Sequence, residues 1–239
     1  VGISGNSAGS TIAVTKWGTI LNRESGSWEI QIDRNCQGIG KLRGDHNSGV
    51  YAMCGNNHGL ILQQQGNDWN QIDIGLDSGL ETYWYDFWVV DGKTIFVIGC
   101  QRNENYYMGP DFLLQYDGTA WHVLEEFSED LKAVWASAKD DVYVVGKTYS
   151  GTDKILHYDG SSWNTVWKTE YTRLSGIWVS SASDIFVVGE DGLVLHFDGS
   201  SWESMETGVT SSLSQVHGSG PDNVYAISQD GTIIRYITN

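Results

Sequence analysis

The stretch Asp159-Gly160-Ser161-Ser162-Trp163 recurs in this sequence as Asp198-Gly199-Ser200-Ser201-Trp202 and, in a looser form, as Asp117-Gly118-Thr119-Ala120-Trp121. Each copy follows a short apolar segment that ends in an aromatic residue, such as Ile155 to Tyr158 or Leu193 to Phe197. The copies are spaced at about 40 residues, a period typical of proteins that repeat one small structural unit. The repeat therefore predicts a repetitive architecture and marks where its units end.

Short segments rich in β-branched and aromatic residues lie upstream of the repeated stretch and predict a second strand in each unit. These segments are 11–14, 50–53, 95–98, 142–145, 185–188 and 224–227. At a constant distance before them lies an apolar residue that marks a first strand, most clearly Leu131, Leu174 and Leu213. Each unit thus reads as a small meander of strands.

Four antiparallel strands in a unit of this length are typical of a β-propeller blade. We therefore predict an all-β fold, a single propeller domain over 1–239 with six blades at approximately 1–35, 36–80, 81–127, 128–170, 171–209 and 210–239. The sixth repeat reaches Tyr236 without a Trp-bearing fourth strand. We expect the last blade to be incomplete, with three strands.

The Asp-Gly-x-x-Trp stretch has a mechanical interpretation that needs no ligand. An Asp side chain accepts hydrogen bonds from backbone amides in turns, and Gly tolerates a positive φ, so the stretch predicts the turn between the third and fourth strands. The Trp then supplies a large apolar surface for packing between neighbouring blades.

The same stretch resembles the Asp box of sialidase-like (BNR-like) propellers, in which Asp, Gly and Trp hold the same turn. The spacing from Asp to Trp is one residue shorter here. With Val142-Tyr143-Val144-Val145-Gly146, the chain also looks like the repetitive propellers of secreted bacterial proteins, over most of residues 95–236. The resemblance implies a propeller fold and an extracytoplasmic location, whereas a fold of this kind carries many unrelated functions.

The chain carries 30 acidic residues against 14 Lys and Arg, a formal net charge of −16. Such a field repels phosphate backbones, so we expect no nucleic-acid partner. No apolar run is long enough to span a bilayer, so we expect no membrane insertion.

The three cysteines allow one disulfide. Cys36 precedes the first strand of the second blade and Cys54 ends the second strand, so the two lie at facing ends of an antiparallel pair and are our disulfide candidate. A disulfide would fit an oxidising compartment and therefore a secreted or cell-surface protein. Three free cysteines are the alternative. We expect Cys100 to be a buried thiol. No Cys-x-x-Cys spacing indicates zinc, so we expect no cofactor, with calcium a weak alternative because no Asp-x-Asp-x-Asp-Gly loop is present.

Two connections between second and third strands, 101–110 and 147–153, are longer than the others and belong to neighbouring blades. They predict a raised patch on the loop face, to which the connection between blades four and five adds two more residues. The predicted ligand-binding residues are Arg102, Tyr106, Tyr107, Tyr149, Tyr171 and Arg173.

Aromatic faces stack on sugar rings while polar groups bind the hydroxyls, and the same residue types anchor protein partners. We predict a non-catalytic recognition or scaffold module for a glycan or an extracellular protein. Loops that only pack on themselves are the other interpretation of this patch.

The alternative is a carbohydrate-active enzyme, a glycoside hydrolase or lyase, which needs two facing carboxylates. Its candidates are Asp86, Glu125, Glu126, Glu129, Asp130 and Asp153.

Two columns of residues repeat once per blade. The first-strand column is Gly5, Arg43, Trp88, Trp135, Trp178 and His217, whose Trp members we expect to pack between blades. The third-strand column is Asn22, Gln63, Gln115, His157, His196 and Arg235, which we expect to be a solvated strand face and not a set of metal ligands.

Overall fold

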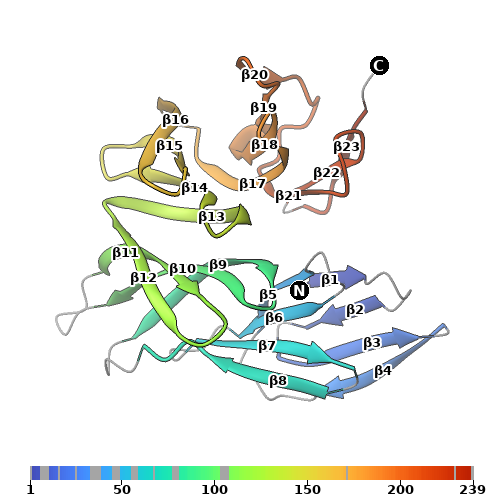
Figure 1. The fold of residues 1–239 in the computed structure, drawn as a ribbon. Helices are drawn as coiled ribbons and strands as arrows, with labels where there is room; N and C mark the ends of the chain where they lie inside the picture. The colour runs from blue at the N-terminus through green and yellow to red at the C-terminus, as the bar shows by residue number, and fades with distance from the viewer. Residues whose placement is uncertain are drawn as a thin grey trace. The chain divides into compact units, whose positions relative to one another are not determined.

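The structure, a computed structural model, describes residues 2–5, 11–15, 17–24, 26–32, 39–44, 49–54, 59–66, 68–76, 81–102, 108–170, 172–228 and 230–237. The described chain consists of small antiparallel sheets and one 3-10 turn, η1 (Glu190–Gly192). It divides into two compact units, Val1–Glu126 and Phe127–Asn239 (Figure 1). The sheets are the blades of a six-bladed β-propeller, which confirms the predicted fold class.

The first three blades are four-stranded sheets whose strands follow one another in chain order. Their strands are β1 (Gly2–Gly5), β2 (Thr11–Val14), β3 (Ile20–Glu24), β4 (Ser27–Ile32), β5 (Ile39–Gly44), β6 (Val50–Cys54), β7 (Leu60–Gln65), β8 (Asp68–Asp73), β9 (Thr82–Asp91), β10 (Thr94–Arg102), β11 (Met108–Tyr116) and β12 (Trp121–Phe127).

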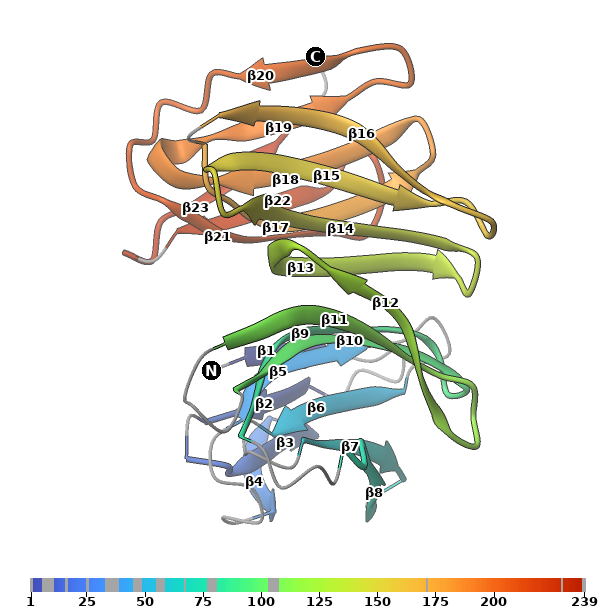
Figure 2. The same cartoon turned by 90° about the vertical axis from the view of Figure 1, so that its left-hand side faces the viewer.

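Blades four and five have four strands, and blade six has three in the described chain (Figure 2). Their strands are β13 (Glu129–Ala138), β14 (Asp141–Thr148), β15 (Thr152–Tyr158), β16 (Trp163–Glu170), β17 (Leu174–Ser181), β18 (Asp184–Gly189), β19 (Val194–Phe197), β20 (Trp202–Met205), β21 (Leu213–Gly218), β22 (Val224–Ser228) and β23 (Ile233–Tyr236). The incomplete last blade is confirmed, and each sheet falls within one predicted blade range. A single domain over 1–239 stays a prediction.

The core lies between blades. All five residues of β6 are buried, because the strand has a blade on each side. Side chains alternate along a strand, so Val50, Ala52 and Cys54 pack with residues of blade one such as Ile12. Tyr51 and Met53 pack with residues of blade three. Burial on both faces explains why the second strands read as continuous apolar runs rather than as alternating patterns.

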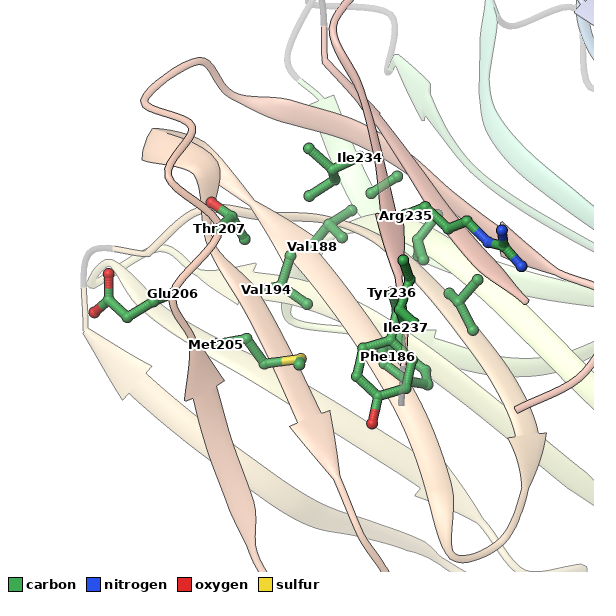
Figure 3. A pocket seen from close by; sticks show the side chains of 13 residues that line it. Phe186, Val188, Val194, Met205, Glu206, Thr207, Ile234, Arg235, Tyr236 and Ile237 are labelled. Atoms are coloured by element: carbon green, nitrogen blue, oxygen red, sulfur yellow. The ribbon is translucent and has the colours of Figure 1, made fainter. Parts of the chain in front are cut away.

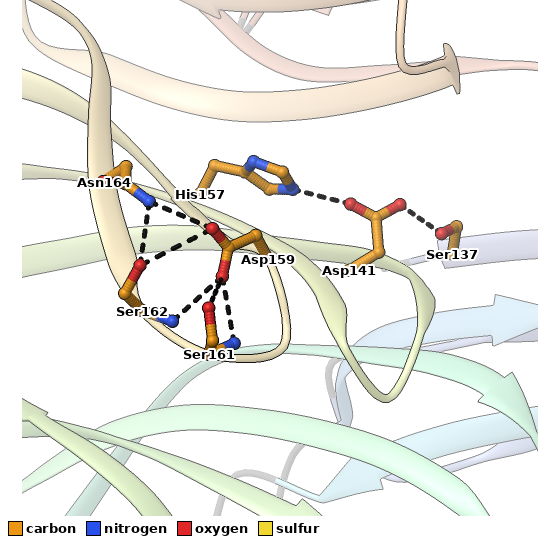
Figure 4. A network of polar contacts seen from close by, with 7 residues as sticks. All are labelled: Ser137, Asp141, His157, Asp159, Ser161, Ser162 and Asn164. Atoms are coloured by element: carbon orange, nitrogen blue, oxygen red, sulfur yellow. Dashed lines mark hydrogen bonds and ion pairs between the residues drawn. The ribbon is translucent and has the colours of Figure 1, made fainter.

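The repeated Asp builds the turn between the third and fourth strands, as predicted. Asp159 Oδ1 accepts hydrogen bonds from the backbone N–H of Ser161 and of Ser162, both at 2.9 Å (Figure 4). Gly160 has a φ of 88°. Asp117 and Asp198 make the same contacts in blades three and five.

In blades two, three and five the tryptophan at the start of the fourth strand contacts the preceding blade. Trp69 Nε1 donates to Gln31 Oε1 at 3.0 Å, and Trp121 Nε1 donates to the Asp73 carbonyl at 3.0 Å. The rings of Trp202 and Trp167 lie 6.4 Å apart. The prediction that these residues pack between blades is confirmed.

The first-strand column also packs between blades where its members are described. A Cβ on Gly218 of blade six would lie 2.6 Å from Cη2 of Trp178 in blade five, so the indole lies flat against that glycine. In the first unit, the Arg43 guanidinium lies 5.7 Å from the ring centre of Trp88. Both contacts join neighbouring first strands, as the packing interpretation requires.

Candidate functional site

The predicted binding residues divide between the two units. Arg102 lies in the first unit, and Tyr149 and Arg173 lie in the second. Tyr106, Tyr107, Tyr171 and the disulfide candidate Cys36 lie outside the described residues. A shared patch of all six binding residues therefore stays a prediction, as does the Cys36–Cys54 disulfide. Cys54 is buried, and Cys100 is a buried thiol whose Sγ lies 2.8 Å from Tyr85 Oη.

Arg102 ends β10 and is engaged within its own blade. Its Nη1 lies 3.0 Å from Glu81 Oε2, and its guanidinium lies 4.9 Å from the ring centre of Tyr83. The Tyr83 hydroxyl donates to the same Glu81 oxygen at 3.1 Å. These contacts form a small cluster of a cation, an acid and an aromatic ring on the surface.

Tyr149 lies at the tip of the β14–β15 hairpin and is 81% exposed. The inserted residues 147–153, which we predicted as part of a raised patch, belong mostly to the two strands of the hairpin. Lys147 pairs with Asp153 across the hairpin, so the insertion lengthens both strands and leaves a tight turn closed by Gly151, whose φ is 94°. The insertion lifts one aromatic side chain into solvent on a regular hairpin.

Arg173 lines a polar pocket of about 570 Å³ in the second unit. The pocket lies at the starts of three first strands, β13, β17 and β21, with further residues from β14, β15 and η1. It is lined by Asp130, Lys132, Lys147, Asp153, Arg173, Leu174, Ser175, Glu190, Ser212, Leu213 and Ser214. We refer to it as the Arg173 pocket.

Asp153 holds the chain segment that carries Arg173. Asp153 is 1% exposed, and its carboxylate accepts three backbone hydrogen bonds. Oδ2 accepts from the N–H of Thr172 at 3.1 Å and of Arg173 at 3.0 Å, and Oδ1 accepts from the N–H of Leu174 at 3.2 Å. Arg173 has a φ of 43°, an unusual conformation for a non-glycine residue. A buried carboxylate that binds consecutive amides therefore fixes an otherwise unfavourable backbone at the pocket.

Cations and anions are balanced in the Arg173 pocket although the chain is strongly acidic. Lys132 Nζ lies 2.6 Å from Asp130 Oδ1, and Arg173 Nη1 lies 3.0 Å from Glu190 Oε1. The contact with Glu190 raises the pKa of Arg173. Lys147 also lines the pocket, and no carboxylate of the described chain forms an ion pair with it.

A second polar pocket of about 440 Å³ shares Glu190 with the Arg173 pocket and continues along the connection from blade five to blade six. The Arg173–Glu190 pair therefore lies where the two pockets meet. Its two side chains are 63% and 42% exposed.

Most residues of the Arg173 pocket were missed by the sequence analysis. Leu131, Leu174 and Leu213, which mark the first strands, are buried. Their neighbours line the pocket: Asp130 and Lys132, Arg173 and Ser175, Ser212 and Ser214. The signal was present as polar residues on both sides of a repeated leucine, since alternate residues of a strand face the opposite way.

Four of the six acids named for an enzymatic alternative, Asp86, Glu129, Asp130 and Asp153, are engaged in the fold, whereas Glu125 and Glu126 are exposed on β12. Asp86 is 1% exposed and contacts Lys41 Nζ at 2.9 Å and Arg43 Nη2 at 2.8 Å. Glu129 contacts Lys154 Nζ at 2.6 Å. Together with the three amides bound by Asp153, these contacts favour a structural role for each carboxylate.

The third-strand column is aligned as predicted, because Asn22, Gln63, Gln115, His157, His196 and Arg235 each face the corresponding residue of the second strand. The expectation of a solvated face is wrong for Asn22, which is buried. His157 stacks on Tyr143 with ring centres 4.1 Å apart, and its Nε2 lies 2.7 Å from Asp141 Oδ1.

The neighbours of His157 show what this network can do. Ser137 donates its hydroxyl to Asp141 and not to the imidazole (Figure 4). Nucleophilic catalysis requires the histidine to take the serine proton, with the carboxylate on the far side of the ring. The order here is serine, carboxylate, imidazole, so the network orients side chains inside the blade. Blade five repeats it with Ser180, Asp184 and His196.

In the ranges that the structure describes, no group of three or more His, Cys, Asp or Glu side chains is arranged to hold a metal ion. None of the described helical residues forms a helix long and apolar enough to cross a membrane.

No protein-family model and no curated protein sequence match this chain. Solved propeller structures are similar in fold. YCF48 from Cyanidioschyzon merolae has a TM-score of 0.67 at 13% identity, covering 95% of this chain and 79% of that chain. The six-bladed lectin of Aleuria aurantia, which has a novel fucose recognition mode, has a TM-score of 0.59 at 12% identity, covering 98% and 88%. YCF48 bound to D1 peptide has a TM-score of 0.51 at 14% identity, covering 96% and 90%. At these identities the likeness shows the fold alone.

Proposed function

We propose that this propeller is a non-catalytic recognition module that binds a glycan in the Arg173 pocket. The observation that carries the proposal is the pocket itself, a concave site of about 570 Å³ that combines serine hydroxyls with paired charges. Sugars present many hydroxyls that both donate and accept, and such a mixed lining can satisfy them. The volume lies within the range usual for small-ligand sites.

Two features of the pocket support binding over catalysis. Its carboxylates are engaged: Asp153 accepts three amides, Asp130 contacts Lys132, and Glu190 contacts Arg173. The backbone at Arg173 is fixed, so the pocket is preorganised and a ligand need not order it. Tyr149 is exposed on the hairpin whose Lys147 and Asp153 line the pocket, and with the predicted Tyr171 it is our candidate aromatic contact for a sugar ring.

A glycan-array screen of the intact chain, fucosylated glycans included, tests the proposal. Lys147→Ala removes a cationic residue that lines the pocket and has no ion pair within the described chain. We expect it to weaken binding of the best ligand by about tenfold or more, since a hydrogen bond to a charged group contributes about 1.5–3 kcal/mol. Lys168→Ala is the matched control, because Lys168 is exposed on β16 of the same blade and lines neither pocket.

A silent array with the folded wild-type chain would contradict the proposal, and so would equal binding by the two lysine variants. Arg173→Asn probes the ion pair with Glu190 while keeping a residue type that tolerates a positive φ. We expect it to weaken the glycan without lowering the melting temperature strongly.

A protein partner is the second candidate function. The cluster of Arg102, Glu81 and Tyr83 combines residue types that anchor protein interfaces. YCF48, a propeller of similar fold, binds a peptide. Pull-down with wild-type chain and with Arg102→Ala tests this candidate, and a partner lost with Arg102→Ala would support it.

We further propose an extracytoplasmic, secreted or cell-surface location. It fits the predicted Cys36–Cys54 disulfide and the sequence motifs that resemble those of secreted bacterial propellers. Alkylation of the unfolded chain without reductant tests it. One reactive thiol, Cys100, is expected, and three would contradict the disulfide and remove this argument for the location.

A further inference from the structure

The acidic side chains of the Arg173 pocket all have partners inside the fold. Both carboxylate oxygens of Asp153 accept backbone hydrogen bonds. Asp130 contacts Lys132, and Glu190 contacts Arg173. The guanidinium of Arg173 has five N–H donors and this one carboxylate partner in the described chain. The pocket therefore has more donors than acceptors left for a ligand.

Lys147 is the main source of these donors. It is half-buried on β14 and lines the pocket. Its cross-strand neighbours are Asp130 on β13 and Asp153 on β15, yet neither carboxylate forms an ion pair with it. An ammonium group carries three donors and no acceptor, and it binds most strongly to an anionic acceptor. The group that best complements Lys147 is therefore an anion that a ligand brings.

The second pocket has the opposite character. Its described lining includes the acids Glu190, Asp191 and Glu206 but no Lys, Arg or His. Glu206 also borders an apolar pocket of about 300 Å³, and its carboxylate points away from the apolar side chains there, such as Val194 (Figure 3). Asp191 and Glu206 are exposed, and neither forms an ion pair in the described chain. Carboxylate oxygens accept hydrogen bonds from hydroxyl groups and repel other anions.

The two pockets adjoin at a fixed boundary. Glu190 lines both of them. Its backbone N–H donates to the Arg173 carbonyl at 3.3 Å, and its Oε1 lies 3.0 Å from Arg173 Nη1. Backbone and side chain thus link the same two residues. A ligand longer than one sugar residue can lie across this pair, with donors on one side of it and acceptors on the other.

We propose that the glycan bound here is an oligosaccharide that lies across the Arg173–Glu190 pair. An acidic sugar occupies the Arg173 pocket, where its anionic group contacts Lys147, and a neutral sugar occupies the second pocket. This inference rests on the proposed glycan binding and adds the charge and the direction of the glycan. The anionic group is a carboxylate or a sulfate ester, both of which accept hydrogen bonds from an ammonium group.

The net charge of the chain makes this selectivity informative. At −16, the protein as a whole repels an anionic glycan. Binding of an acidic glycan therefore requires a local cation that is available to it, and Lys147 meets that requirement in the Arg173 pocket.

The probe is an array of oligosaccharides that alternate a uronic acid with a neutral sugar. Each is printed beside its carboxyl-reduced form and beside a sulfated neutral oligosaccharide of the same length. We expect carboxyl reduction of the best-bound uronate to weaken binding by about tenfold or more. Lys147→Gln should reduce this ratio to about twofold or less. Lys168→Gln is the matched control and should leave the ratio unchanged, because Lys168 lines neither pocket.

The sulfated spots distinguish the two sources of the anion. Binding of sulfated oligosaccharides that Lys147→Gln removes, without binding of uronates, would support the proposal and assign the anion to a sulfate ester.

A pair of variants on β20 tests the direction of the glycan. Ser204 lines the second pocket, whereas the adjacent Glu203 lines neither pocket, since alternate residues of a strand face opposite ways. We expect Ser204→Phe to weaken the best-bound acidic oligosaccharide by about tenfold or more and the acidic monosaccharide by about twofold or less. Glu203→Phe should leave both affinities nearly unchanged. Melting temperatures establish that all variants are folded.

The outcomes separate this inference from the proposed function. Neutral glycans that bind as tightly as acidic ones would overturn the inference and leave glycan binding in place, and so would an acidic glycan that Lys147→Gln binds as the wild type does. An equal loss of the monosaccharide and the oligosaccharide in Ser204→Phe would contradict the direction. A silent array with the folded wild-type chain would overturn the proposed glycan binding, and this inference with it.

Discussion

Blades five and six carry different polar pairs at the same positions. In blade five, His196 of the third strand contacts Asp184 at the start of the second, and Ser180 donates to that carboxylate. In blade six these positions hold Arg235 and Asn223. Asn223 Nδ2 donates to Ser219 Oγ at 2.7 Å, and Arg235 lies over the Tyr225 ring at 5.6 Å.

The comparison indicates that the polar residues of the second and third strands change together from blade five to blade six. An acid accompanies the imidazole, and a neutral amide accompanies the guanidinium, which packs on the aromatic ring instead. The buried leucine at the start of the first strand is kept in both blades. The fold is therefore set by the apolar positions and the turns, while the polar pairs vary around them.

The largest effect is expected where the chain passes from blade five towards blade six. A Cβ on Gly192, whose φ is 72°, would collide with the carbonyl oxygen of Val209, while a Cβ on Gly208, whose φ is 69°, meets no atom within 4 Å. We expect Gly192→Ala to lower the free energy of unfolding by about 4 kcal/mol, as overpacking adds to the cost of the left-handed backbone. Gly208→Ala should cost about 1 kcal/mol.

Urea unfolding of both glycine variants measures the difference. Equal costs for the two would mean that the backbone conformation alone matters and that the close approach of Val209 is relieved without strain.

The next effect concerns the fourth strand, which blade five has and which blade six of the described chain lacks. Trp202 packs against Phe197 in its own blade and Trp167 in the preceding one. We expect Trp202→Ala to cost about 3 kcal/mol, at the lower end for removing a large aromatic side chain because Trp202 is only half-buried. Trp28, on the fourth strand of blade one, is 46% exposed, and Trp28→Ala should cost about 1 kcal/mol or less. Thermal unfolding followed by near-ultraviolet circular dichroism compares them, and a ranking in the opposite order would contradict the wedge interpretation.

The strands and turns could be predicted from the sequence because their determinants are local. Gly160 and Asp159 specify a turn by themselves, and runs such as Val142–Val145 specify a strand buried on both faces. The Arg173 pocket could not be predicted, since Lys132, Ser175 and Ser214 come together only when three first strands lie side by side. The polar residues around Tyr149 are compatible with a loop or with a hairpin, and only the cross-strand pairing of Lys147 with Asp153 distinguishes the two.

A double-mutant cycle sharpens the comparison of the polar pairs. Asp184→Asn should cost about 1 kcal/mol because it weakens the hydrogen bond with His196 Nε2. His196→Arg should cost a similar amount because the longer guanidinium does not reproduce the stack of the imidazole on Phe186. The double variant reproduces the pair of blade six, and we expect a coupling of about 1 kcal/mol in its favour. The control combines Asp184→Asn with Lys168→Ala, which should be additive within about 0.5 kcal/mol. Additivity in the main cycle as well would mean that the two positions vary independently.

The smallest effect concerns how the free energy of unfolding depends on pH. Blades four and five each have an Asp-Gly turn before the fourth strand, which the three-stranded blade of the described chain lacks. Hydrogen bonds from the Ser161 hydroxyl and the amides of Ser162 and Ser161 lower the pKa of Asp159 to about 2, and equivalent bonds from the Ser201 amide, the Ser200 hydroxyl and the Ser200 amide lower the pKa of Asp198 to about 2. In the unfolded chain these groups take up protons near the ordinary value of 3.8. The unfolded state then binds more protons, so the stabilisation is complete above about pH 4 and is lost as the pH falls to about 2.

Asp159→Asn combined with Asp198→Asn should therefore flatten the fall in the free energy of unfolding between about pH 4 and about pH 2. Urea unfolding across that interval measures it. Asp68→Asn, at an exposed position on β8, changes a charge outside these turns and should leave the slope nearly unchanged. If all variants lose stability in acid as steeply as the wild type, the turns do not store this stabilisation. The acid sensitivity would then belong to the other turn carboxylates whose pKa hydrogen bonds lower, Asp117 and Asp230.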